Sequence, residues 1–269
     1  MHLIIQNRLI QVREEVIKMN KEEHFLTSRF LDLANVAYER SIYTYTDFLN
    51  LNEISILESF KNQLPPVKVY LSGGNNYAER KIAIFSPAEI YYEESLPIEI
   101  IEIAPINPKY ADILNHRDFL GAILSLGINR NKIGDILVRE NKAYVYCISD
   151  ISDYIIDHLK KIKHTLVDCK KCENSKEQIV PSFKNIKGTV ANIRLDSLIA
   201  TAFNSSRSSI ISFIEGGKVF VNGKLITSNG YQIKENDIVS VRGKGRFVFR
   251  RVLGNTKKGR NVVSIDLYI

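Results

Sequence analysis

Apolar residues in the first quarter of the chain recur at about one-turn intervals and share one face of a predicted helix. They are Phe25, Leu26, Phe30, Leu33 and Ala37. A second helix is expected after Thr46, and Pro65-Pro66 must end this part because proline lacks an amide donor. Residues 1–66 are therefore predicted to form a helical N-terminal domain. Residues 1–20 are predicted to be helix rather than signal peptide, because no cleavage site follows an apolar run.

From residue 67 the apolar pattern changes to the alternation of a β-strand. Alternating residues on both sides of the turn Gly73–Asn76 predict a hairpin. Further strands are predicted at Ile98–Ile106, Asp135–Val138, Ala143–Ile148 and Thr165–Cys169, and helices at Asn115–Gly127 and Asp150–Lys163. The succession strand, helix, two strands, helix, strand is that of the split β-α-β fold. We predict a ferredoxin-like (RRM-like) RNA-binding domain at residues 67–169, followed by a polar linker at residues 170–187.

Two short amphipathic helices and a small sheet are predicted after the linker. Asn192 is the expected N-cap of the first helix, Ser205 or Ser206 begins the second, and Gly216-Gly217 ends it. Their apolar stripes are Leu195, Leu198, Ile199, Ala202 and Phe203, and Ile210, Ile211 and Ile214. Asn222-Gly223 predicts a type I′ hairpin turn, because both central residues of that turn need positive φ. The whole chain is therefore predicted to be an α+β protein of three domains.

Positive charge is concentrated in the C-terminal domain, residues 188–269. The 269-residue chain has a net charge of +7, and residues 181–269 contain 15 Lys and Arg against 5 Asp and Glu. A basic domain of this kind is typical of nucleic-acid binding, because each neutralised phosphate releases counterions. Binding to a membrane surface is the alternative, but the aromatic-rich amphipathic helix that it needs is missing.

The number of cysteines and the length of the apolar runs restrict the classes of protein to which this chain can belong. Cys147, Cys169 and Cys172 are too few and too clustered for a disulfide framework, which favours a reducing compartment, the cytoplasm. No apolar run approaches the roughly 20 residues that span a bilayer. No strand-linked G-x-G-x-x-G or P-loop is present, so a nucleotide cofactor and a methyltransferase activity are not expected. We expect a monomer without cofactors.

The basic residues of the C-terminal domain occur at a helix start and in two turns. Ser206-Arg207 lies at a predicted helix N-terminus, where free amides and the helix dipole attract anions. The two glycine-containing turns carry Arg242, Lys244 and Arg246, and Lys257, Lys258 and Arg260. Glycine lets a backbone approach an RNA strand closely. We therefore predict that these residues contact RNA phosphates.

Four segments of the C-terminal domain follow one another at a specific spacing. They are Arg194-Leu195-Asp196, Ser206-Arg207, Ile214–Gly223 and Asp237–Phe247. In that order they resemble the RNA-binding domain of small-subunit ribosomal protein S4, also called the alpha-L motif. The resemblance implies that the two helices and the loop after them present a set of residues to an RNA backbone. These are Arg194, Ser206, Arg207, Lys218 and Lys224.

Upstream segments extend the resemblance over nearly the whole chain. They are Gly73-Gly74, Ala78-Glu79-Arg80, Asn115–Gly121, Leu126–Ile128 and Ile133–Ile136. With them the chain resembles the YlmH-type family. The resemblance implies an RNA-binding middle domain, a role in ribosome-associated quality control on stalled large subunits, and a link to cell division. For the middle domain we predict a second RNA contact at His116, Arg117, Arg130 and Lys132.

Other chemistries are possible at three places. His116-Arg117-Asp118 contains an acid/base residue, but Asn115 and Asp118 are better explained as a helix cap. The possible zinc ligands His158, His164, Cys169 and Cys172 lack a second CxxC pair, so free thiols and no metal are favoured. Arg194-Leu195-Asp196 also resembles a catalytic motif of pseudouridine synthases, although no catalytic domain is evident.

Together these patterns predict a non-enzymatic RNA-binding protein that contacts rRNA, tRNA or both on the large ribosomal subunit. The alternatives are an RNA-modifying enzyme of the pseudouridine-synthase kind and an interaction protein at the division site.

Overall fold

The computed structural model describes residues 21, 23–87, 89, 95–172 and 183–268. The chain forms two compact units, Met1–Ile179 and Val180–Ile269. The predicted helix at residues 1–20 and the middle of the predicted linker lie outside the described residues. Each unit is described by itself.

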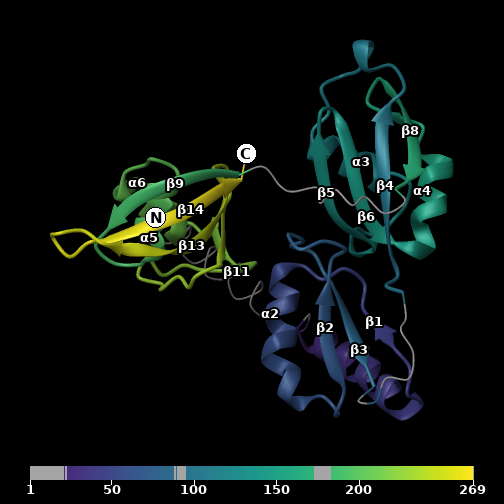
Figure 1. Ribbon diagram of the computed structural model, residues 1–269, viewed down its shortest axis with the longest axis horizontal. Coiled ribbons are helices and arrows are strands. Elements are labelled where there is room, and N and C mark those ends of the chain that lie inside the picture. Colours follow the sequence, from purple (N-terminus) through teal and green to yellow (C-terminus); the bar gives the residue numbers. More distant parts are fainter. Residues whose placement is uncertain (1–20, 22, 88, 90–94, 173–182, 269) are drawn as a thin grey trace, which may run out of the picture. The chain divides into compact units, whose positions relative to one another are not determined.

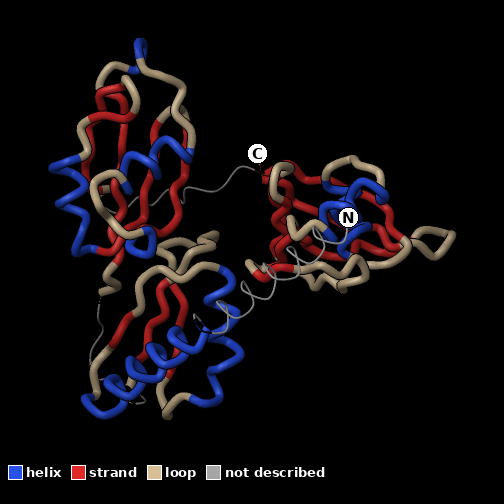
Figure 2. Tube along the Cα trace, turned by 180° about the vertical axis from the view of Figure 1, so that it is seen from behind, coloured by secondary structure: helices blue, strands red, loops and turns tan. Residues whose placement is uncertain are grey.

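The N-terminal part of the first unit is a three-stranded sheet covered by two helices (Figure 2). Residues 23–40 form the first helix, followed by β1 (Thr44–Tyr45), α2 (Leu51–Phe60), β2 (Lys68–Ser72) and β3 (Ile82–Ser86). The strand order is β1-β3-β2, with antiparallel pairs. The predicted helical stripe is confirmed at Phe30 and Ala37, which are fully buried, whereas Phe25 is 73% exposed. The helices bury these residues against Leu57 and Phe85.

The second helix starts later than predicted. Asn50 is its N-cap and forms a capping box with Glu53, whose side chain accepts from the Asn50 amide at 2.6 Å. Thr46 instead directly follows β1, and its hydroxyl accepts a hydrogen bond from the Ala83 amide of β3 at 2.8 Å. The prediction that the helix begins directly after Thr46 and includes Asp47–Leu49 was therefore wrong, because the reciprocal Asn-Glu bonds fix its start at Leu51.

The hairpin β2-β3 belongs to the N-terminal sheet rather than to the middle domain, in which the sequence pattern placed it. Its strand β3 pairs with β1, and Phe85 packs against the first helix. Two-residue β1 was too short to be detected from the sequence, so the hairpin's pairing partner was missed.

The middle part of the first unit is a five-stranded antiparallel sheet. Its elements are β4 (Ile98–Pro105), α3 (His116–Leu124), β5 (Ile133–Arg139), β6 (Lys142–Ile148), α4 (Ser152–His158), β7 (Lys161–Ile162) and β8 (Thr165–Lys171). The strand order β5-β6-β4-β8-β7 is consistent with the expected split β-α-β arrangement. Phe119 and Ile123 of α3 and Ile155 of α4 are fully buried in a core shared with Ile101 and Val145.

Helix α4 is shorter than the predicted helix Asp150–Lys163. It ends at His158, and the following residues form β7, which pairs with β8. Lys163 has φ 53° in the tight turn between these strands. The strand pairing and the burial of Leu159 outweigh the helical pattern that continues in the sequence.

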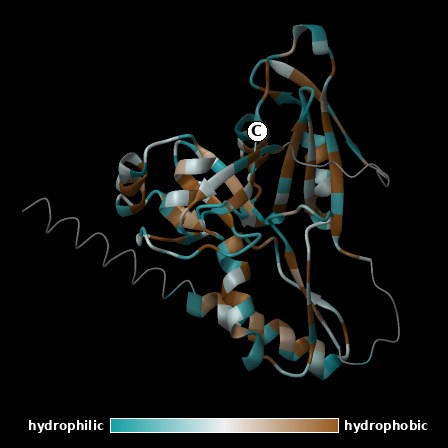
Figure 3. Ribbon diagram, turned by 60° about the vertical axis from the view of Figure 1, so that its left-hand side comes forward, coloured by the Kyte–Doolittle hydropathy of each residue, from teal (hydrophilic) through white to brown (hydrophobic). Residues whose placement is uncertain are grey.

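The C-terminal unit is a six-stranded antiparallel sheet with two helices. Its elements are β9 (Phe183–Val190), α5 (Leu195–Ala202), α6 (Arg207–Glu215), β10 (Val219–Val221), β11 (Lys224–Leu225), β12 (Ile238–Val241), β13 (Gly245–Asn255) and β14 (Asn261–Tyr268). The strand order is β11-β10-β12-β13-β14-β9. Leu198 and Ile214 from the helices are fully buried in one core with Phe247. Hydrophobic residues line the strands, and the turns are more hydrophilic (Figure 3).

Some of the turns, caps and boundaries predicted for this unit are confirmed, and others were wrong. Asn222 and Gly223 have φ 47° and 77°, which confirms the type I′ turn. Asn192 does not cap α5, because the N-cap position is Arg194, which makes no side-chain capping bond. Residues 183–187, predicted as linker, are the first half of β9 and pair with β14. Their polar side chains were misleading, because one face of this edge strand is open to solvent.

Candidate nucleic-acid interface

The N-terminus of α6 is built by a serine cap and an arginine. Ser206 is the N-cap and accepts a hydrogen bond from the Ser209 amide at 3.3 Å. Arg207 is the first helical residue, and 56% of its side chain is exposed. One nitrogen of its guanidinium donates to Asp196 Oδ2 at 2.6 Å. The pair fixes the guanidinium beside the free amides of the helix start, where an anion is favoured.

Asp196 holds a second arginine as well. Its side chain is only 2% exposed, and it accepts from Arg194 Nε and Nη2 at 3.3 Å and from the Ser197 hydroxyl at 3.2 Å. Burial alone would raise the pKa of this carboxyl, but the hydrogen bond and charge of Arg207 and the charge of Arg194 outweigh it and lower the pKa below 3.8. One buried carboxylate therefore orients two guanidiniums at the starts of α5 and α6.

The turn between β12 and β13 brings further cations to α6. Lys244 donates to the Ser205 hydroxyl at 3.1 Å, and its ammonium lies 5.3 Å from the centre of the Phe213 ring. Lys218 lies at the same distance from that ring. Arg207, Lys218 and Lys244 thus come from three segments and converge on one helix. We call these three residues the α6 surface.

The remaining predicted residues do not join this surface. Lys257, Lys258 and Arg260 form the turn at the other end of β13, about 30 Å away by the rise of an extended strand. Arg260 is anchored there by a bond to the Thr189 carbonyl at 3.0 Å. Lys224 is exposed on the short strand β11. Arg242 lies over Phe220 and Arg246 over Tyr268.

The chain is similar to known proteins over most of its length. The family model described as "Putative RNA-binding domain in YlmH" matches residues 92–176, and the S4 domain model matches residues 193–239. The ribosome-associated protein quality control protein P2 of Bacillus subtilis is 32% identical over 250 residues, which are 91% of this chain and 95% of that protein. This chain belongs to the YlmH-type family. A solved structure titled "Cell division protein ylmH from Streptococcus pneumoniae" is 20% identical and covers 56% of this chain and 92% of that one. Its TM-score is 0.47, which is too low to support an inference about this chain.

The S4 domain match spans α5, α6 and the β10-β11 hairpin. It therefore contains Arg194, Arg207, Lys218 and the Asp196 carboxylate, whereas Lys244 comes from the strand turn after it. The α6 surface of this YlmH-type protein therefore contains two residues of the matched domain and one residue of the hairpin that follows it.

Two of the upstream segments that resemble the family, Ala78-Glu79-Arg80 and Ile133–Ile136, join two sheets of the first unit. The Asp135 carboxylate accepts from the amides of Glu79 and Arg80 at 2.7 and 3.2 Å. The Arg80 guanidinium donates to the carbonyls of Ile133 and Phe48 at 3.1 and 2.7 Å. Burial raises the pKa of Asp135 and lowers that of Arg80. These motif residues form a structural junction between the N-terminal and middle sheets.

Two of the predicted second-contact residues belong to the same junction. The Arg130 guanidinium donates to the carbonyls of Ile133 and Gly134, and burial lowers its pKa to about 10. Lys132 forms an ion pair of 2.7 Å with Asp47. Both cations are half-buried and are bound by internal groups of the first unit.

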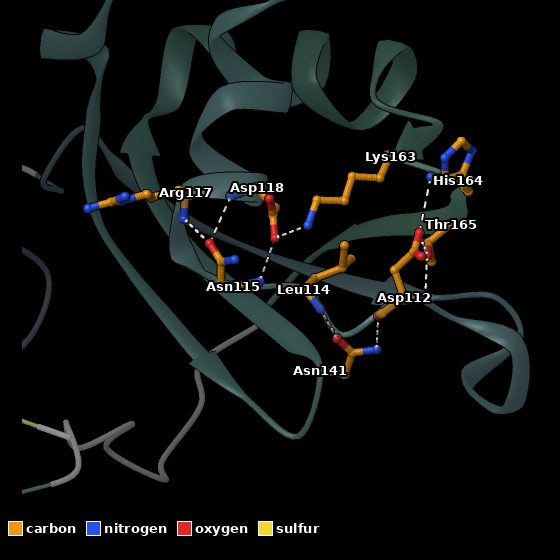
Figure 4. Close-up of polar contacts among 9 residues, drawn as sticks. All are labelled: Asp112, Leu114, Asn115, Arg117, Asp118, Asn141, Lys163, His164 and Thr165. Carbon is orange, nitrogen blue, oxygen red and sulfur yellow. Dashed lines mark hydrogen bonds and ion pairs between the residues drawn. The ribbon is translucent and has the colours of Figure 1, made fainter.

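The other two, His116 and Arg117, are exposed at the start of α3. Asn115 caps this helix in a capping box with Asp118, which confirms the cap interpretation of the motif (Figure 4). A hydrogen bond from Lys163, 2.7 Å away, and one from the Asn115 amide lower the pKa of Asp118. The carboxylate therefore stabilises the helix start, and Arg117 points away from it.

The residues considered as zinc ligands differ in their surroundings. Cys169 is buried and donates to the Leu159 carbonyl, and burial raises its pKa to about 11. His158 contacts the Tyr154 carbonyl at 2.9 Å. Within the described parts of the chain, no three His, Cys, Asp or Glu residues are grouped so as to hold a metal ion. None of the helices described is long and apolar enough to span a membrane.

Several contributors to the interface were not recognised in the sequence. Asp196 was interpreted as a helix-start charge, because nothing local indicates a partner eleven residues later. Phe213 carries a weak signal, since it is an aromatic residue between Ser212 and Ile214 that is only partly buried against the core. The ring of such a residue can attract cations from neighbouring segments.

Proposed function

We propose that this chain is a non-enzymatic RNA-binding protein of the cytoplasm that contacts rRNA, tRNA or both on the large ribosomal subunit. Its role is in ribosome-associated quality control. The observation that carries the proposal is the α6 surface, where Arg207 lies at the capped N-terminus of α6 and Lys218 and Lys244 lie at the Phe213 ring of the same helix. The family membership and the name of the Bacillus subtilis relative support the same role.

The chemistry of this surface suits an RNA backbone. Phosphates are attracted by the free amides of the α6 start and by the planar guanidinium of Arg207, which can bind two phosphate oxygens. The two lysines at the Phe213 ring add two positive charges to this surface. Such contacts recognise the shape of a folded RNA rather than its sequence.

A catalytic use of Arg194-Leu195-Asp196 is not supported by the geometry. The Asp196 carboxylate is 2% exposed and bound by two arginines, so a substrate base has no access to it. Its contacts are those of a structural ion pair. We therefore favour a binding protein over a pseudouridine-synthase-like enzyme. No feature of the site favours a role at the division site.

The middle domain is the proposed second contact. Its match to the YlmH RNA-binding domain supports this, and His116 and Arg117 are exposed where α3 begins. We expect a phosphate to bind at this helix start by the same chemistry that we propose for α6.

The test is the salt dependence of binding between the full chain and a structured RNA, a labelled stem-loop from the large-subunit rRNA. Replacing Arg207, Lys218 and Lys244 together by alanine should lower the slope of log K against log salt by about 2 to 3, because each lost phosphate contact removes about 0.9. The matched control replaces Lys68, Lys109 and Lys161, exposed lysines of the first unit, and should leave the slope nearly unchanged. Equal slopes for both variants would refute the proposal.

A further inference from the structure

The sheet of the C-terminal unit has a second face, opposite to α5 and α6 (Figures 1 and 2). Residues alternate across it, so that Phe247 and Phe249 lie in the core beneath the helices and Arg246 and Arg250 project to the other side. Arg246, which the sequence grouped with Arg242 and Lys244, is therefore separated from the α6 surface by the thickness of the sheet.

Aromatic and cationic residues form a row across this helix-free face. Phe183 of β9 pairs with Tyr268 of β14, and Arg246 of the neighbouring strand lies over the Tyr268 ring. Arg246 of β13 pairs with Ser240 of β12, and Ser240 pairs with Phe220 of β10. The row crosses five adjacent strands and is about 19 Å long at the usual strand spacing.

Each of the three rings is paired with an arginine. The guanidinium carbons of Arg242, Arg246 and Arg250 lie 4.9, 5.7 and 5.5 Å from the ring centres of Phe220, Tyr268 and Phe183. The Phe183 and Tyr268 rings also contact each other edge to face at 4.8 Å. All three rings are partly exposed.

The charge of this face is positive. Arg242 and Arg246 are exposed, and Lys187 of β9 projects to the same side. Asp266 lies in the middle of the face, but its carboxylate is bound by Arg250 Nε at 2.6 Å and by the Asn185 amide at 2.7 Å. An anionic partner is therefore favoured.

We propose that this ring-arginine row binds unpaired nucleotides of an RNA strand, with bases stacked on the rings and phosphates held by Arg242 and Arg246. The inference rests on the proposed function for the nature of the partner and adds a second, separate contact. Sheet faces with exposed aromatics bind two or three stacked bases in this way, and guanidinium planes also stack on bases. An acidic protein would use the charges but not the rings, so RNA is the better match. The C-terminal unit would then hold folded RNA on the α6 surface and a single-stranded segment on the opposite face.

The test compares two labelled RNAs by fluorescence anisotropy with the full chain. One is a single-stranded oligouridylate of about twelve nucleotides, and the other is a stem-loop with a short closed loop. The ring variant, Phe220→Leu with Tyr268→Leu, should bind the oligouridylate about tenfold more weakly or worse and keep its affinity for the stem-loop, because stacking is lost. The α6 variant, Arg207→Ala with Lys244→Ala, should lose mainly the stem-loop. Tyr268→Phe keeps the ring and should behave as wild type.

The outcomes separate this inference from the proposed function. Unchanged oligouridylate binding by the ring variant would overturn the inference, while loss of the stem-loop by the α6 variant would still support the proposed function. Competition by polyglutamate as strong as by unlabelled oligouridylate would also overturn it, since charge alone would then explain binding. If the ring variant fails to fold, Arg246→Gln leaves all three rings in place and should likewise weaken oligouridylate binding, because a phosphate contact is lost.

Discussion

Replacing Asp196 by asparagine should destabilise the C-terminal unit without unfolding the first unit. The change removes a charge that is 2% exposed and paired with Arg194 and Arg207. Breaking a buried ion pair costs about 3–5 kcal/mol. Asparagine keeps the volume and one acceptor oxygen, and Arg207 is more than half exposed, so water screens its charge. We therefore expect a loss of about 2 kcal/mol, or roughly 10 °C in the melting temperature of a unit of this size.

The loss should depend on pH with a defined sign. The pKa of Asp196 in the folded chain is lowered, because hydrogen bonds and charges from Arg207 and Arg194 outweigh the opposing effect of burial. A depressed carboxyl pKa contributes stability that is present above the unfolded value of about 3.8 and is lost as pH falls through the folded value. The wild type and Asp196→Asn should therefore differ at pH 7, begin to converge near pH 4, and become alike only below the lowered pKa of the folded chain.

Hydrogen exchange of the full chain, read by mass spectrometry on peptides from α5 and α6, measures this directly. Glu215→Gln is the matched control, because it changes the net charge equally at an exposed residue of α6 that only accepts from Asn229. The reasoning would be refuted if exchange in Asp196→Asn and Glu215→Gln differed by less than about 0.5 kcal/mol at pH 7.

Further predictions concern the first unit. Gly134→Ala should destabilise it by about 1–3 kcal/mol, since the added Cβ would lie 2.6 Å from a buried Phe48 ring atom; thermal unfolding equal to wild type would contradict this. Cys172 should be the first thiol to react with a disulfide reagent at pH 8, because burial raises the pKa of Cys147 to about 12 and of Cys169 to about 11. Peptide mapping that finds Cys147 labelled early in the folded chain would be inconsistent with the structure.

Features set by short-range chemistry could be predicted from the sequence. The Asn222-Gly223 turn, the Asn115 cap and the Ser206 cap depend on residues within about four positions, and all three are present. The helix stripes of the C-terminal unit were also clear, because each helix buries one face against a single sheet.

Features set by contacts between distant segments could not be predicted. The hairpin β2-β3 was assigned to the wrong sheet because its partner β1 has two residues, and β9 was taken for linker because an edge strand tolerates polar residues. The division of the basic residues between two sheet faces and two strand ends follows from strand register, which the sequence alone does not fix. For the same reason Arg130 and Lys132 were grouped with exposed cations, although both bind groups in a junction.

The most direct test of the central claim is gradient sedimentation of the tagged chain from cell lysate at low and high salt, with sequencing of the co-migrating RNA. We expect migration with large ribosomal subunits at low salt, release at high salt, and enrichment of rRNA and tRNA. The variant with alanine at Arg207, Lys218 and Lys244 should stay near the top of the gradient even at low salt. Free wild-type protein at low salt, or a variant that sediments with subunits as wild type does, would contradict it.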